Sequence, residues 1–241
     1  MNQELLSAIG LSTIAVVAAA LYFRIGPDEV LKEREPVLES TEIDEQAAEV
    51  IRENVSELKT SFMLKLLPIA FFTQVIIAVI LCMFYKAGLN NIVLTEFYLS
   101  ALWAVSFYDF HFRLIPNRIL AASLVIRVII FAAELVIYGG SAVLSLLLSG
   151  AIAAAGLGVA AILCRLISPN SVGFGDVKLL LVTGVYLGLD KAFGAVLPSM
   201  VLLFVVSVYL LTVKKVSRKT ELPFAPFLLG GTLLGALLMG I

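Results

Sequence analysis

Long apolar stretches are the feature that most constrains the fold of this 241-residue chain. A helix needs about 20 predominantly apolar residues to cross the hydrocarbon core of a bilayer. Eight stretches are candidates, at residues 4–23, 64–85, 92–108, 119–138, 141–164, 177–189, 191–213 and 222–240. The sequence therefore predicts an all-α, polytopic membrane helix bundle of about eight transmembrane helices.

Composition excludes the main alternatives to a membrane bundle. Hydrophobic residues make up 61% of the chain and charged residues 15%, whereas soluble domains carry about 45–50% and about 25%. The net charge of −1 argues against a nucleic-acid partner and leaves the lipid bilayer as the expected surroundings. Two cysteines, Cys82 and Cys164, and one histidine form no Cys/His zinc cluster, so we expect no metal site.

The positive charges indicate how the chain is oriented in the membrane. Fourteen of the seventeen Lys and Arg residues fall on one side of the predicted bundle, in segments 24–65, 110–118, 165–178 and 214–219. The opposite loops hold only Lys86 and Lys191. Cytoplasmic loops carry the excess of Lys and Arg. We therefore expect a multi-pass protein of the cytoplasmic membrane with both termini outside.

The predicted organisation has three parts. Residues 1–23 form the first transmembrane helix; they lack the amino-terminal positive charge of a signal peptide, and we expect them to be retained. Residues 24–63 form a cytoplasmic connector that holds eleven of the eighteen carboxylates and becomes an amphipathic helix from Thr41. It is a solvated connector or a docking element for basic peptides. Residues 64–241 form the transmembrane core.

Four carboxylates lie at or near membrane depth, where an ionisable group is costly and indicates function. Glu96 and Glu134 lie nearer the external side, where we expect them to reach the interface or to bind a neighbouring helix. Asp109 closes the third apolar stretch and Asp176 opens the sixth, so both are predicted at the cytoplasmic face on different helices. Two carboxyl groups brought together there can share a proton and activate water.

Two glycines precede the second aspartate, in the sequence Gly173-Phe174-Gly175-Asp176. Glycine permits unusual backbone angles and close approach of another chain, although Gly and Asp are also common in ordinary turns and helix caps. Because a peptide substrate has to lie beside the aspartates, we expect Gly173 and Gly175 to leave room for its backbone, with the larger effect of an added methyl group at Gly175.

Three ordered motifs give the sequence a resemblance to the type IV prepilin peptidases, a branch of the GxGD intramembrane aspartyl proteases. Asp109 stands before the turn Ile115-Pro116-Asn117, and Gly173-Phe174-Gly175-Asp176-Val177-Lys178 is similar to the family's GxGDxK motif. The late segment Pro223-Phe224-Ala225-Pro226-Phe227 resembles the PFxPF segment of bacterial members. From its position near the end of an apolar stretch, we expect the side chain of Lys178 to reach the lipid interface.

The resemblance implies an aspartic endopeptidase with Asp109 and Asp176 as its catalytic residues. Its substrates would be prepilin or pseudopilin precursors of type IV pilus or secretion systems, cleaved after a short basic leader at the cytoplasmic face. The family's two CxxC pairs are absent from residues 24–63, and no GSFLN-like stretch occurs in the first apolar stretch. We therefore expect a peptidase without cofactors. S-adenosylmethionine would be needed only for an N-methyltransferase activity that these residues do not support.

Two other functions remain open at the level of sequence. Tyr108-Asp109 and the GxGD motif also fit presenilins and signal peptide peptidases, but the Pro-Ala-Leu motif of those proteases is missing around Ala225. Membrane aspartates also serve proton- or cation-coupled transporters. Transporters often show internal repeats, and the two halves of this chain show none.

Overall fold

The computed structural model describes residues 2–26, 65–167, 172–213 and 222–241, and every regular element in these ranges is a helix. The predicted connector 24–63, with its amphipathic helix, lies almost entirely outside the described residues. The basic segment 214–219 also lies outside them.

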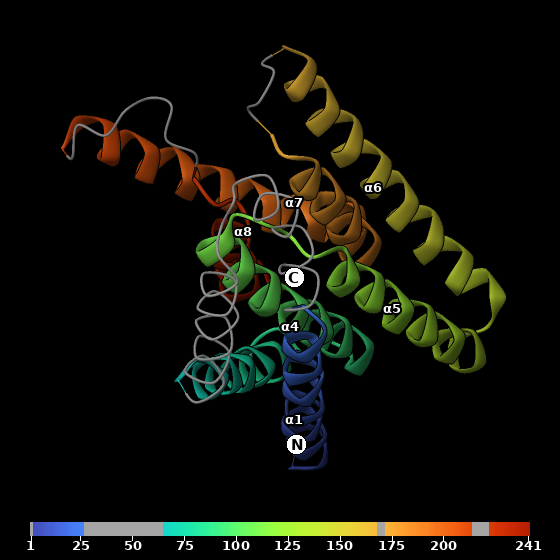
Figure 1. Ribbon diagram of the computed structural model, residues 1–241. Helices are drawn as coiled ribbons and strands as arrows, with labels where there is room; N and C mark the ends of the chain where they lie inside the picture. The colour runs from blue at the N-terminus through green and yellow to red at the C-terminus, as the bar shows by residue number, and fades with distance from the viewer. Residues whose placement is uncertain (1, 27–64, 168–171, 214–221) are drawn as a thin grey trace, which may run out of the picture.

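Seven helices, of which α7 is kinked, make up the described part of the chain (Figure 1). They are α1 (Asn2–Ile25), an unlabelled helix (Lys65–Met83), α4 (Leu89–Phe112), α5 (Asn117–Tyr138), α6 (Gly140–Ile167), α7 (Phe174–Thr212) and α8 (Ala225–Met239). Five of them, all except α4 and α8, are long and apolar enough to cross a membrane. The chain is therefore a multi-pass membrane protein, as the apolar stretches predict.

The boundaries differ from the predicted ones at three places. The predicted stretches 177–189 and 191–213 belong to the single element α7, in which two helices meet at a kink at Gly188 (φ 69°, ψ −177°), close to the predicted boundary. The helix α4 runs four residues past the predicted end at 108, so Asp109 lies inside its last turn. The helix α8 has 15 residues instead of the predicted 222–240, because Pro223 and Phe224 precede its first turn. At about 1.5 Å per residue it is shorter than the hydrocarbon core.

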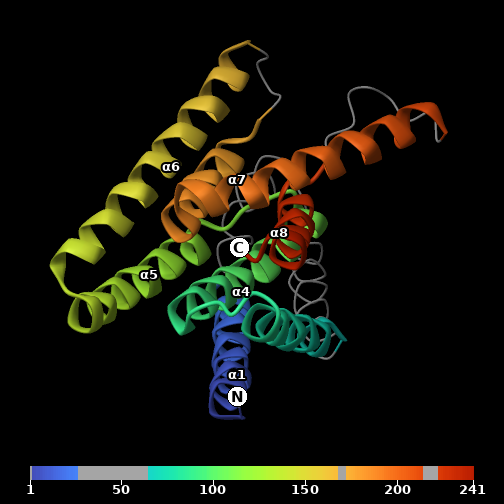
Figure 2. The same cartoon turned by 180° about the vertical axis from the view of Figure 1, so that it is seen from behind.

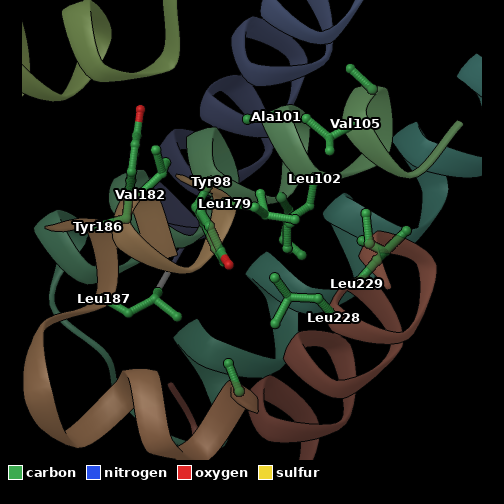
Figure 3. Close-up of a cluster of buried hydrophobic side chains, with 14 of the residues drawn as sticks. Tyr98, Ala101, Leu102, Val105, Leu179, Val182, Tyr186, Leu187, Leu228 and Leu229 are labelled. Carbon is green, nitrogen blue, oxygen red and sulfur yellow. The ribbon is translucent and has the colours of Figure 1, made fainter. Parts of the chain in front are cut away.

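The core lies where α4 meets α7 and α8. Figure 3 shows Tyr98 and Leu102 of α4 beside Leu179 of α7 and Leu228 of α8, and all four side chains are almost completely buried. The helix α1 packs against α4 on another side, and α5 and α6 follow each other as a hairpin beside α7 (Figures 1 and 2). Thus α4, which carries Asp109, stands at the centre of the described bundle.

Small residues let α7 approach its neighbours closely. A Cβ atom on Gly184 would collide with the backbone of Ala154 in α6, and one on Gly231 of α8 would collide with Ser199 of α7. Close helix contacts through small residues are a common way of packing in membranes, where burial of apolar surface contributes little to helix association. The first half of α7 therefore packs on α6 and the second half on α8, with Gly188 between them.

Candidate active site

Asp109 lies in the last turn of α4 and is fixed by the start of α8. Its side chain is 6% exposed. Its Oδ2 atom accepts a hydrogen bond of 2.8 Å from the backbone N–H of Ala225, the first residue of α8. The first N–H groups of a helix have no partner within the helix, and the positive end of the helix dipole favours a carboxylate there. The segment Pro223–Phe227 therefore supplies a donor to Asp109.

Asp176 occupies the first turn of α7, as the sequence predicts. Gly173 is the N-cap residue, with extended angles (φ −70°, ψ 152°). The N–H of Gly173 donates a hydrogen bond of 3.0 Å to Oδ2 of Asp176. This is the return half of a capping box, in which an acidic residue three positions after the cap binds the backbone of the cap. Asp176 therefore has a backbone donor on one oxygen, as Asp109 has.

The two aspartates are similarly held by backbone donors. Burial raises the pKa of Asp109, and the negative charge of Asp176 adds a smaller contribution in the same direction. Asp109 is buried and Asp176 is partly buried, and each has its Oδ2 atom bound to a backbone N–H at the start of a different helix. These donors orient each carboxyl group, and a neighbouring negative charge favours the protonated form of a carboxyl group.

The Ile115-Pro116-Asn117 turn connects α4 to α5 and packs against the start of α7. Pro116 is the N-cap residue of α5, at φ −64°. A Cβ atom on Gly175 would lie 3.0 Å from Cβ of the buried Ile115. The absence of a side chain at Gly175 therefore lets the turn after Asp109 approach the helix that carries Asp176.

Lys178 contacts the same turn. Its Nζ atom donates a hydrogen bond of 2.7 Å to Oδ1 of Asn117. The reach of Lys178 to the lipid interface stays a prediction, and the structure adds a partner for its ammonium group on α5. The turn faces the first turns of α7, and an acceptor from another helix lies within reach of the ammonium group. Together with the Gly175–Ile115 contact, this bond joins the first two sequence motifs into one unit.

The glycines do not serve to reach left-handed backbone angles. Gly173 has a negative φ, and Gly175 is not among the glycines of positive φ in the described residues. A Cβ atom on Gly173 would lie 3.2 Å from Oδ2 of Asp176. Gly173 therefore leaves space beside the carboxyl group, and Gly175 leaves space for Ile115.

Glu134 and Glu96, the other two carboxylates in the membrane helices, have different surroundings. Glu134 accepts hydrogen bonds from Asn90 at 2.7 Å and from Arg127 at 3.1 Å, and it forms a buried ion pair with Arg127. Glu96 is fully buried in α4, with no ion-pair partner in the described part of the chain. Neither lies at the end of its helix that faces the aspartates.

Two contributors to the site carry no signal in the sequence motifs. Ala225 is the variable position of the PFxPF segment, yet it supplies the donor to Asp109. Arg165 donates a 2.6 Å hydrogen bond to the carbonyl of Val172, and its guanidinium lies 4.0 Å from the ring centroid of Phe174. These contacts order the approach to Gly173. In the sequence, the only sign of this role is that Arg165 directly follows a long apolar stretch.

Within the described ranges, no group of three or more His, Cys, Asp or Glu side chains is arranged to hold a metal ion. Neither Cys82 nor Cys164 forms a disulfide in the described ranges.

Comparison with known proteins identifies the central part of the chain. Residues 97–212 match the model of the type IV leader peptidase family. The match contains Asp109, the Ile115–Asn117 turn and Asp176, and it ends before the segment that donates to Asp109. No curated protein and no solved structure matches the chain.

Proposed function

Because residues 97–212 match the type IV leader peptidase family, we propose that this chain is a member of that family, an intramembrane aspartic endopeptidase that removes the basic leader from prepilin or pseudopilin-like precursors. Membership in the family implies a protease. The proposal adds the catalytic residues, Asp109 and Asp176, the class of substrate and the membrane face.

One observation carries the assignment of the catalytic residues. Asp109 and Asp176 are 67 positions apart in the chain. Nevertheless, the Lys178–Asn117 bond and the contact of Gly175 with Ile115 bring their chain segments together, and the charge of Asp176 contributes, after burial, to raising the pKa of Asp109. Each also has a backbone donor on one oxygen. Carboxyl groups that merely cap a helix or face solvent have no need of a second carboxyl group nearby, since the two repel each other when both are ionised.

The proposed reaction is hydrolysis of a peptide bond by an activated water. The ionised carboxylate of the pair takes a proton from water, and the water oxygen bonds to the scissile carbonyl carbon. The protonated carboxyl group donates its proton to the carbonyl oxygen. As the tetrahedral intermediate collapses, the C–N bond breaks and the leaving nitrogen takes the proton that the first carboxyl group gained from water. The second carboxylate takes back a proton from a hydroxyl of the intermediate as the new carbonyl forms, so the pair returns to its starting state. No cofactor and no metal takes part in this scheme, and S-adenosylmethionine is not required.

The proposed substrates have a basic leader, then a glycine before the scissile bond, then an apolar helix. The excess of Lys and Arg in the loops next to both aspartates supports a cytoplasmic active site, and the leader of such a precursor stays in the cytoplasm. The acidic segment between residues 24 and 63 provides the opposite charge to a basic leader.

Gly173 and Gly175 have separate roles in this proposal. Gly173 is exposed and lies against the carboxyl group of Asp176, so it leaves one side of that group open to the substrate backbone. Gly175 lies against Ile115 and permits the two motifs to pack. Pro223, Phe224 and Pro226 hold the start of α8, where Ala225 donates to Asp109.

The experiment is cleavage of a synthetic precursor by the purified full chain in detergent or nanodiscs. The peptide carries a basic leader, a glycine and an apolar helix, and a matched control peptide has that glycine replaced by aspartate. We expect mass spectrometry to show one cut directly after the glycine and none in the control. Absence of cleavage by well-folded protein, or cleavage of both peptides at scattered positions, would contradict the proposed activity.

A further inference from the structure

The break at Gly188 leaves two backbone groups of α7 without their helical partners. In a regular helix the N–H of Leu189 would donate to the carbonyl of Val185. Instead, the N–H of Leu189 donates to Oγ of Ser149 in α6 at 3.0 Å, and the carbonyl of Val185 accepts from Nε of Arg127 in α5 at 3.3 Å. Side chains from two other helices thus satisfy both groups.

Arg127 is itself held from several directions. Its Nη1 atom donates to Oε2 of Glu134 at 3.1 Å, and both side chains are at most 3% exposed. Glu134 accepts a second bond, of 2.7 Å, from Nδ2 of Asn90 at the start of α4. The centre of the guanidinium lies 3.5 Å from the ring centroid of Phe131. A buried charge pair in a membrane helix is costly, and so it indicates a function.

The first half of α7 is tied to α5 at three levels. Lys178 binds Asn117 near the aspartates, and the hydroxyl of Tyr186 donates to the carbonyl of Ser123 at 2.6 Å. Arg127 binds the carbonyl of Val185 in the same last turn before Gly188. Figure 3 shows Tyr186 and Leu187 on this part of α7, at the edge of the buried core.

A fourth hydrogen bond connects the first half of α7 to α4, the helix that carries Asp109. The hydroxyl groups of Tyr98 in α4 and Thr183 in α7 lie 2.7 Å apart and share a hydrogen bond. The segment from Asp176 to Leu187 is therefore a continuous helix with polar anchors to α4 and α5, and its free end is the break at Gly188. Loss of the anchor at that end would let the half-helix rotate or shift with the carboxyl group it carries.

We propose that Arg127 is a positioning residue that holds Asp176 in register with Asp109 by binding the free carbonyl of Val185, with Ser149 supporting the same break from α6. This inference rests on the proposed peptidase function. Val185 lies nine positions after Asp176, about 13 Å along the helix axis. Arg127 therefore acts through the helix and does not touch the reacting atoms.

The first test measures the geometry without any use of activity. Spin labels are placed at Phe110→Cys and Phe174→Cys, two exposed positions next to the aspartates, in the full chain with Cys82→Ala and Cys164→Ser. We expect a narrow distribution of distances between the labels. Arg127→Gln should broaden or shift it, and Arg127→Lys, which can still donate to the carbonyl, should restore part of the narrow peak.

The second test uses kinetics, with a matched pair of serines in α6. Arg127→Gln should lower kcat by about 10- to 100-fold with little change in KM, because small misplacement of a catalytic group costs about that much. Ser149→Ala should give a smaller fall in kcat. Ser145→Ala is the control, since that hydroxyl binds only a carbonyl of its own helix, at 2.7 Å, and is exposed. It should leave kcat unchanged.

The two tests separate this inference from the proposed function. If the unmodified chain cleaves no precursor, the peptidase proposal fails while the distance measurement still decides the role of Arg127. If Arg127→Gln does not fold, Ser149→Ala decides instead. An unchanged distance distribution in the folded variants, or equal kcat for Ser149→Ala and Ser145→Ala, would overturn the positioning role.

Discussion

Lys178 and Asn117, which belong to different motifs, are joined by a hydrogen bond of 2.7 Å between Nζ and Oδ1. Asn117 is the first residue of α5 and follows the turn that leaves Asp109, whereas Lys178 lies two positions after Asp176. The bond therefore connects the chain segments of the two aspartates next to the proposed site. It gives a structural role to Asn117 in the first motif and to Lys178 in the second.

Loss of this bond should weaken the proposed activity without destroying it. Lys178→Met removes the donor, and Asn117→Leu removes the acceptor. Because a hydrogen bond to a charged group contributes about 1.5–3 kcal/mol and this one is exposed, we expect a fall in cleavage rate of about 10-fold or less. Asn117→Asp, which keeps an acceptor, is the matched control. Rates per folded molecule provide the measurement, and full activity of Asn117→Leu would contradict this role.

Alanine substitutions should separate the roles of the two glycines. At Gly175 the new methyl group would press on Ile115 at 3.0 Å, so Gly175→Ala should lower the melting temperature, by an amount that corresponds to about 1–3 kcal/mol of overpacking. At Gly173 it would face the carboxyl group of Asp176, so Gly173→Ala should lower the cleavage rate with little change in melting temperature.

The control for both glycines is Gly156→Ala in α6, where an added Cβ atom meets nothing within 4 Å. Alanine favours a helix over glycine by about 1 kcal/mol, and this variant should be as stable as the unmodified chain or slightly more. Thermal unfolding in one detergent and cleavage rates of the same samples give the comparison. A Gly175→Ala variant that is as stable as Gly156→Ala would exclude tight packing on Ile115.

The two carboxylates outside the site should respond differently to amide substitution. Glu134→Gln leaves the buried Arg127 without its charge partner and should lower the free energy of unfolding by about 3–5 kcal/mol. Glu96 is fully buried without an ion-pair partner in the described ranges, a setting that favours the neutral acid. Glu96→Gln has nearly the same shape and should cost much less. Equal loss of stability in the two variants would contradict this assignment.

Proteolysis should not depend on a metal ion. Since the proposed chemistry is proton transfer between two carboxyl groups and water, incubation with EDTA followed by removal of the chelator should leave the cleavage rate unchanged. The measurement is the initial rate before and after treatment. Complete loss of activity that a divalent ion restores would contradict the metal-free scheme.

The positions of the helices and of the two aspartates could be predicted from the sequence for simple reasons. An apolar stretch of about 20 residues has few alternatives to a helix in a membrane. A carboxylate at the end of such a stretch falls at a defined membrane face. Asp176 indeed lies in the first turn of α7 and Asp109 in the last turn of α4.

The contacts that complete the site could not be predicted in the same way. The bond from Ala225 to Asp109 uses a backbone N–H, which every residue except proline has, so no residue type signals it. At the break in α7 at Gly188, the backbone groups of Val185 and Leu189 bind Arg127 and Ser149, which belong to other helices. A sequence pattern describes one helix at a time, whereas these contacts depend on how the helices pack.

The most direct test of the account is cleavage of the glycine-containing precursor by Asp109→Asn and Asp176→Asn. Asp190→Asn, an exposed aspartate of the same helix α7, is the matched control. Either of the first two substitutions removes the shared ionisation, so we expect each to reduce cleavage per folded molecule by at least about 100-fold, while Asp190→Asn keeps the unmodified rate. Near-normal cleavage by a folded Asp109→Asn or Asp176→Asn variant would contradict the catalytic pair.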